Sequence, residues 1–166
     1  DDNHAIQNSF NTPGEGWVWE KFLDPGTRFE TSFDCPGYID IQDSLQFRLR
    51  VRGQTRSSST NDHHIQVDIN GFTGVDAFFD DREERIYQFN VPGDLIYSRD
   101  NSLVIRSVRQ NSEPISRFYF DWFECDIPVR FQARSNRLTV SDSTLPADAD
   151  IRVSGFSSDS IFVWNQ

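Results

Sequence analysis

A strict alternation of apolar and polar residues in the middle of the chain predicts a β-strand from Leu45 to Gly53. The apolar positions are Leu45, Phe47, Leu49 and Val51, and the arginines between them are Arg48, Arg50 and Arg52. Successive side chains of a strand point to opposite faces of the sheet. This strand is therefore expected to bury one face and to present a row of arginines on the other.

The residues that follow predict a second strand and a hairpin. Ile65, Val67 and Ile69 alternate with Gln66 and Asp68, and the strand ends at Asn70-Gly71, which is typical of a two-residue hairpin turn. The chain is expected to return antiparallel from Phe72. His63 and His64 are adjacent, so they point to opposite faces and are poorly placed to share a metal ion. One packed and one exposed histidine is the simpler expectation.

Turn sequences divide the rest of the chain into further short strands. They are expected at Trp17–Leu23, Arg28–Phe33, Ile86–Val91, Leu103–Val108 and Tyr119–Cys125. The last of these is apolar on both faces, which predicts a central strand with Trp122 in the core. No helical apolar period of useful length is present, so the fold class is all-β, an antiparallel jelly-roll β-sandwich.

Turn positions also suggest how the chain is divided. Residues 1–16 are expected to be a polar N-terminal segment, and residues 17–128 the sandwich. Residues 129–166 hold four short strand candidates between Leu-Pro and Asp-rich turns, and are expected to be a small C-terminal β appendage or the start of a following domain. These candidates are Val129–Ala133, Leu138–Ser141, Ile151–Ser154 and Ile161–Trp164.

Composition agrees with strands and narrows the partners. Fifteen Phe, four Trp and four Tyr suit pleated, half-buried surfaces. A net charge of −10 argues against nucleic acid, whose phosphates need a cationic surface. No apolar stretch is long enough to span a bilayer. Cys35 and Cys125 are the only cysteines, and an even pair fits an oxidising setting, secreted or at the cell surface. A Cys35–Cys125 disulfide and two separate buried thiols both remain open.

The candidate ligand-binding residues are aromatic or planar and polar. Trp17 and Trp19 share one strand face, and if exposed they would form a stacking platform for sugar rings; packing in the core is the alternative. Arg48, Arg50, Arg52, Gln66 and Asp68 offer donors and acceptors suited to sugar hydroxyls or acidic glycans, or they form a solvated surface. Oxygen-rich side chains favour calcium over zinc if a metal is bound, but the pattern assigns no ligands.

Signatures of catalysis are missing from the sequence. It contains no G-x-S-x-G, no glycine-rich phosphate loop and no H-E-x-x-H. A thiolate dyad between a cysteine and His63 or His64 is disfavoured, because Cys35 lies in a predicted turn and Cys125 in a core strand. The chain is therefore expected not to be an enzyme, although a protein that contains it could be a secreted hydrolase.

Four short strings, taken in order, resemble a known family. They are His64–Gly71 (HIQVDING), Phe89–Pro92 (FNVP), Asn101–Leu103 (NSL) and Phe120–Glu124 (FDWFE). Their order resembles the jelly-roll module that precedes the peptidase domain in gingipain-like secreted proteins of family C25. It is also similar to the galactose-binding-like jelly roll of carbohydrate-binding modules. The similarity covers roughly Trp17 to Trp164.

Three functions follow from these observations. The first is a non-catalytic accessory module of a secreted multidomain protein that binds a polysaccharide or other glycan. The second is a structural or interaction module that contacts neighbouring domains of the same chain, flanking a C25-like peptidase domain. The third is a β-sandwich glycosidase or lyase, which would need two carboxylates in one cleft. A shared fold does not decide among them, and the first is the preferred hypothesis.

Overall fold

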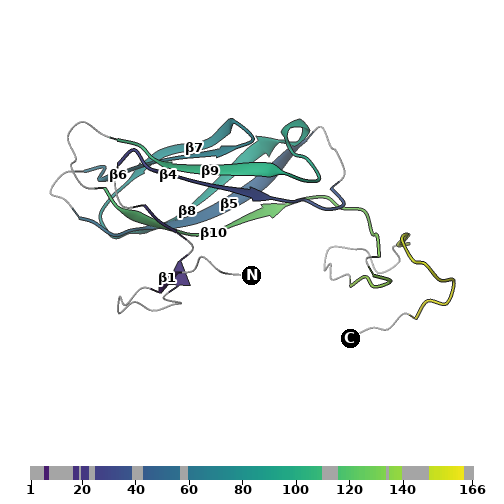
Figure 1. Ribbon diagram of the computed structural model, residues 1–166. Helices are drawn as coiled ribbons and strands as arrows, with labels where there is room; N and C mark the ends of the chain where they lie inside the picture. The colour runs from purple at the N-terminus through teal and green to yellow at the C-terminus, as the bar shows by residue number, and fades with distance from the viewer. Residues whose placement is uncertain are drawn as a thin grey trace.

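The protein is a sandwich of two four-stranded antiparallel sheets. The computed structural model describes residues 6–7, 17–18, 20–22, 25–38, 43–56, 60–109, 116–133, 135–139 and 150–162. One sheet has the order β3-β10-β5-β8 and the other the order β4-β9-β6-β7, and the two lie face to face (Figure 1). Their strands are β3 (Glu20–Phe22), β4 (Arg28–Phe33), β5 (Ser44–Gly53), β6 (His63–Ile69), β7 (Phe72–Phe79), β8 (Glu84–Pro92), β9 (Asn101–Ser107) and β10 (Phe118–Asp126).

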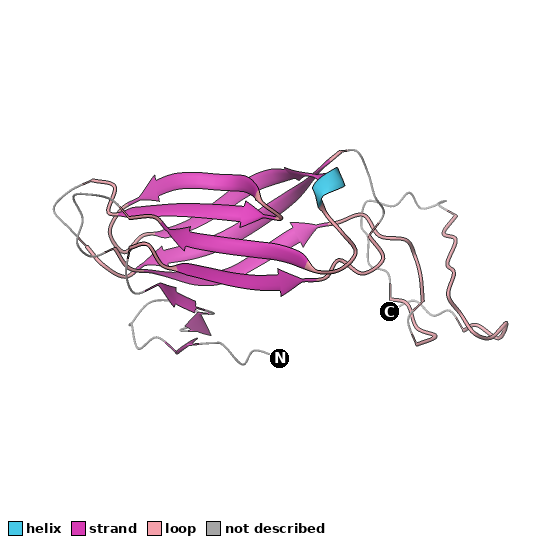
Figure 2. Ribbon diagram, turned by 45° about the horizontal axis from the view of Figure 1, so that its top comes forward, coloured by secondary structure: helices cyan, strands magenta, loops and turns pink. Residues whose placement is uncertain are grey.

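The path of the chain through the two sheets is that of a jelly roll. β10 returns between β3 and β5, and β9 returns between β4 and β6. All pairings within the two sheets are antiparallel. Two interlocked Greek keys produce this order. The prediction of an all-β antiparallel jelly-roll sandwich is confirmed. A single 3-10 turn, η1 (Gly93–Leu95), interrupts the strands and is the helix drawn in cyan in Figure 2.

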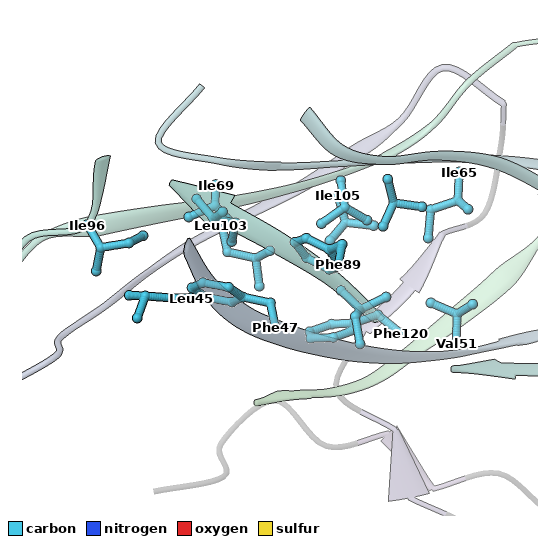
Figure 3. Packing of buried hydrophobic residues seen from close by; sticks show 14 of the residues in the cluster. Leu45, Phe47, Val51, Ile65, Ile69, Phe89, Ile96, Leu103, Ile105 and Phe120 are labelled. Atoms are coloured by element: carbon cyan, nitrogen blue, oxygen red, sulfur yellow. The ribbon is translucent and has the colours of Figure 1, made fainter. Parts of the chain in front are cut away.

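Alternating sequence explains which strand faces are buried. In β5, Leu45, Phe47, Leu49 and Val51 are buried, while the residues between them are half-buried. Side chains from the other sheet, including Ile65, Ile69, Leu103 and Ile105, meet them in one apolar layer (Figure 3). Full burial of an aliphatic or phenyl side chain stabilises the fold by about 1.5–3 kcal/mol relative to exposure. This layer therefore holds the two sheets together.

An extra residue in β10 decides which of its aromatic side chains face inward. The register runs Phe120 to Val51 and then Trp122 to Arg50, so Asp121 is a β-bulge. Phe120 and Phe123 pack into the core, whereas Trp122 shares the outer face with Arg50 and is half-buried. The expectation that Trp122 lies in the core is wrong, because the bulge reverses the alternation that the sequence suggests.

Segments outside the sandwich contain little regular structure among the described residues. β1 (Ile6–Gln7) pairs with β2 (Trp17–Val18). Beyond Asp126, the described residues form two isolated bridges, Tyr38 with Val129 and Gln132 with Ser154. Figures 1 and 2 draw residues 150–162 outside the sandwich. The division at residues 16 and 128 stays a prediction. In the described part of the chain, no helix is long and apolar enough to cross a membrane.

Candidate functional site

The predicted ligand-binding residues lie on two opposite outer faces of the sandwich. Arg48, Arg50 and Arg52 follow the outer face of β5, while Gln66 and Asp68 follow the outer face of β6, in the other sheet. The core separates the two groups, so one ligand could not contact both. Trp17 lies in β2, but its side chain and all of Trp19 lie outside the described residues. The tryptophan platform therefore stays a prediction.

Carboxylates neutralise the arginines on the β5 face. Arg50 Nη2 lies 2.6 Å from Glu84 Oε2, and its Nη1 lies 3.1 Å from Asp121 Oδ2. Arg48 Nη2 lies 3.2 Å from Glu124 Oε2 and 3.4 Å from an oxygen of Asp126. An acidic glycan would have to displace these carboxylates. This face is better suited to holding β5, β8 and β10 together than to binding anions.

The outer face of β6 and β7 presents an exposed aromatic ring. The register pairs His64 with Phe78 and Gln66 with Asp76. The His64 and Phe78 rings are stacked, with centroids 4.2 Å apart and an interplanar angle of 23°. His64 Nε2 and Asp76 Oδ1 are 2.5 Å apart. Phe78 is 48% exposed even though it lies within a strand.

Polar side chains continue this surface toward β9. Arg106 lies opposite Gln66 in the register, and its Nη1 donates to Gln66 Oε1 at 3.3 Å and also to Asp68 Oδ2. Asp68 is largely buried and accepts a second hydrogen bond from Thr73 Oγ1 at 2.7 Å. The guanidinium is thus fixed in place beside the amide. We call the set of His64, Gln66, Asp76, Phe78 and Arg106 the Phe78 platform.

Sequence reasoning found Gln66 and Asp68 but missed the aromatic part of the platform. A signal for it was present, since Phe78 and Phe79 are adjacent in a strand and must point to opposite faces. Phe79 is buried against His63, with ring centroids 4.6 Å apart, so Phe78 points outward. His63 and His64 divide between the faces in the same way. Identifying the platform also required the register between β6 and β7.

His63 has a structural environment. Its Nδ1 lies 3.0 Å from Ser116 Oγ and its Nε2 lies 2.9 Å from the Asp81 carbonyl oxygen. His63 and Ser116 are both buried, so a substrate has no access to the hydroxyl. The Asp81 backbone oxygen takes the place that a carboxylate occupies in a catalytic triad. These hydrogen bonds attach the β7–β8 turn to the sandwich.

Calcium finds no ready-made ligand set in the described residues. No group of three or more His, Cys, Asp or Glu side chains there could hold a metal ion. The carboxylates nearest to one another are already occupied by backbone N–H groups. Asp80 Oδ1 accepts from Asn61 and Asp62, and Asp62 Oδ2 accepts from Asp81 at 3.1 Å. These bonds close the turns before β6 and β8.

Comparison with known proteins supports the fold. The sequence matches no family model and none of the curated proteins. Dimeric latent PorU from Porphyromonas gingivalis, a gingipain-like C25 protein, contains a similar segment. It has a TM-score of 0.57 and 13% identity, and the match covers 86% of this chain and 14% of that chain. The chain thus spans a small part of PorU, and the similarity concerns fold alone.

Two carbohydrate-binding modules are also similar, each with a TM-score of 0.47. One is the CBM36-1 domain of a multidomain xylanase from the hindgut metagenome of Trinervitermes trinervoides, at 11% identity over 75% of this chain and 86% of that chain. The other is a CBM36 module in complex with calcium and xylotriose, at 12% identity over 75% of this chain and 95% of that chain. The predicted resemblance to jelly-roll accessory modules is confirmed.

Proposed function

We propose that this chain is a non-catalytic accessory module of a secreted multidomain protein, and that it binds a glycan at the Phe78 platform. The observation that carries the proposal is the half-exposed Phe78 ring, stacked on His64 and bordered by the side chains of Asp76 and Gln66. Because both strands belong to a sheet, the platform is held rigid before ligand arrives. Such preorganisation lowers the cost of binding.

The chemistry of the platform suits a pyranose ring. An aromatic face packs against the apolar C–H face of the sugar, as aromatic rings do with other flat apolar surfaces. The Asp76 carboxylate accepts hydrogen bonds, while the Gln66 amide and the Arg106 guanidinium can donate them. The platform is open to water, and the contact area is small, so the expected affinity is weak. A net charge of −10 and the nearby Asp76 favour a neutral glycan over an acidic one.

Binding to glycans with matched variants tests this proposal. Wild type, Phe78→Ala and the control Phe162→Ala would be applied to a glycan array, and hits measured by calorimetry. Phe162 is 84% exposed and lies in the C-terminal segment, away from the platform. Loss of one stacking ring is worth roughly 1–1.5 kcal/mol, so Phe78→Ala should weaken binding about tenfold while Phe162→Ala leaves it unchanged.

Further arms separate this site from the alternatives. Calcium or a chelator in the buffer reports on the metal that the sequence suggested. A Trp17→Ala, Trp19→Ala double variant tests the N-terminal platform, and each variant is checked for folding by circular dichroism. Binding that survives Phe78→Ala but not the tryptophan substitutions would move the site to β2. No binding by folded wild type would reject the glycan proposal and favour a module that orients neighbouring domains.

A further inference from the structure

The two cysteines meet at one end of the sandwich. Cys35 follows β4 directly and is 1% exposed, and Cys125 is the last but one residue of β10, opposite Phe47 of β5. Their thiols are hydrogen-bonded to each other. The Phe33 and Phe123 rings, two residues before each cysteine, are also in contact, with centroids 5.1 Å apart. Residues from both sheets therefore hold the sulfur atoms side by side.

This end of the sandwich is where the chain leaves it. The segment around Cys35 holds the departing chain through backbone contacts. Tyr38 forms a bridge with Val129, and the Arg130 N–H donates to the Gly37 carbonyl oxygen at 3.2 Å. The Cys35 N–H itself donates to the Ser98 carbonyl oxygen at 3.2 Å. In Figure 1 the chain runs from the tip of β10 into the C-terminal segment at this point.

We propose that Cys35 and Cys125 are an oxidisable pair, and that their disulfide clamps the point at which the C-terminal segment leaves the sandwich. The oxidant would be a small-molecule or protein disulfide. Its S–S bond is reduced to two thiols, which take up the two protons that Cys35 and Cys125 release as their own S–S bond forms. The clamp would fix the position of whatever follows residue 126 relative to the sandwich. It stands independently of glycan binding.

Burial sets the conditions under which the bond forms. Burial, together with the neighbouring Cys35 and Asp126, raises the pKa of the Cys125 thiol to about 12. Burial also raises the pKa of Cys35, which the hydrogen bond from Cys125 partly offsets. Thiolates attack disulfides and thiols do not. In the folded protein, oxidation should therefore be slow at pH 7 and faster at pH 9, or when the chain folds in the presence of the oxidant.

Intact mass, peptide mapping and thermal unfolding of the full chain test the proposal. Protein refolded with oxidised glutathione is compared with protein kept in a phosphine reductant, and Cys125→Ala is treated in the same way. The expected results are a mass lower by about 2 Da, which is two hydrogens, a cross-linked peptide joining the two cysteines, and a melting temperature higher by roughly 10 °C. Cys125→Ala should show neither the mass loss nor the stabilisation.

Hydrogen exchange then locates the clamp. Amides of residues 127–133 should exchange at least several-fold more slowly in the oxidised protein than in the reduced one. Unchanged mass after refolding with oxidant, intermolecular dimers in place of the internal bond, or a disulfide with no slowing of exchange in residues 127–133 would each overturn the proposal. Since wild type supplies the main readout, the test does not depend on whether Cys125→Ala folds.

Discussion

The side-chain amide of Asn70 donates a hydrogen bond to the side-chain oxygen of Asn101 at 2.9 Å. Asn70 opens the β6–β7 hairpin with a positive φ of 48°, and Asn101 is the fully buried first residue of β9. Both asparagines belong to the short strings on which the family resemblance rests. The hydrogen bond gives those strings a physical reason, since it ties together two turns that are distant in sequence.

Replacing Asn101 with alanine should destabilise the sandwich by about 2–3 kcal/mol. Its amide donates to the carbonyl oxygens of Tyr97 at 2.6 Å and Phe33 at 3.3 Å, and its oxygen accepts from the Tyr97 N–H at 2.8 Å. Alanine leaves several buried polar groups unsatisfied, at about 1–3 kcal/mol each before relaxation. Urea unfolding measures the change. The exposed Asn90→Ala is the control, and equal effects of the two substitutions would contradict the role of Asn101.

Local alternation predicted most of the sandwich, and the register between strands was what it could not supply. Arg28–Phe33 and Leu45–Gly53 were predicted nearly as they are, because one buried face makes the period of two legible. Trp122 was misplaced, because a bulge adds a residue inside a strand that is apolar on both faces. Phe78 and its neighbours in the platform come from two strands. Only the pairing of β6 with β7 brings them together.

Substitution of Tyr87 by phenylalanine should protect the fold at alkaline pH. Its buried hydroxyl has no hydrogen-bond partner among the described residues. Burial, reinforced by Glu83 and opposed by Arg85, raises the pKa of Tyr87 from 10.0 to about 12. The neutral phenol is thus favoured in the folded state, and its contribution to stability is complete below pH 10. That contribution is lost as the pH rises from 10 through 12.

Unfolding free energies between pH 8 and 12 measure this effect. The advantage of Tyr87→Phe over wild type should grow above pH 10 and should be nearly constant below it. Tyr97→Phe is the matched control, since Tyr97 is exposed. Both cysteines are replaced in every variant so that thiol ionisation does not contribute. An advantage that is the same at pH 8 and pH 12 would show that the phenol does not titrate with unfolding.

Gly53→Ala should cost about 1–3 kcal/mol, because a methyl group does not fit at this position. A Cβ there would lie 1.9 Å from the Asp81 carbonyl oxygen and 2.8 Å from His63 Nε2. The β7–β8 turn would have to move, and the hydrogen bond between His63 and Asp81 would be lost. Thermal unfolding gives the change, with Ser44→Ala at the exposed other end of β5 as the control. A melting temperature equal to that of the control would mean that this turn adapts freely.

Deletion of Asp121 should leave the protein folded, although it removes a residue from the middle of a central strand. Phe120 pairs with Val51 and Trp122 with Arg50, so Asp121 is the residue that has no partner in the β5 register. Without it, Phe120 and Phe123 still point inward and Trp122 still points outward. The loss is the 3.1 Å ion pair with Arg50, which keeps Glu84 at 2.6 Å. A partly exposed ion pair is worth about 0–1 kcal/mol.

Deletion of Tyr119 is the sharp control, because it removes a residue from the regular part of the same strand. Tyr119 lies between the buried Phe118 and Phe120, and its loss would turn one of these rings toward solvent. Near-UV circular dichroism and thermal unfolding should find a cooperative fold after deletion of Asp121 and none after deletion of Tyr119. If both deletions abolish folding, the bulge itself is required, and the bend that it puts into β10 contributes to closing the sandwich.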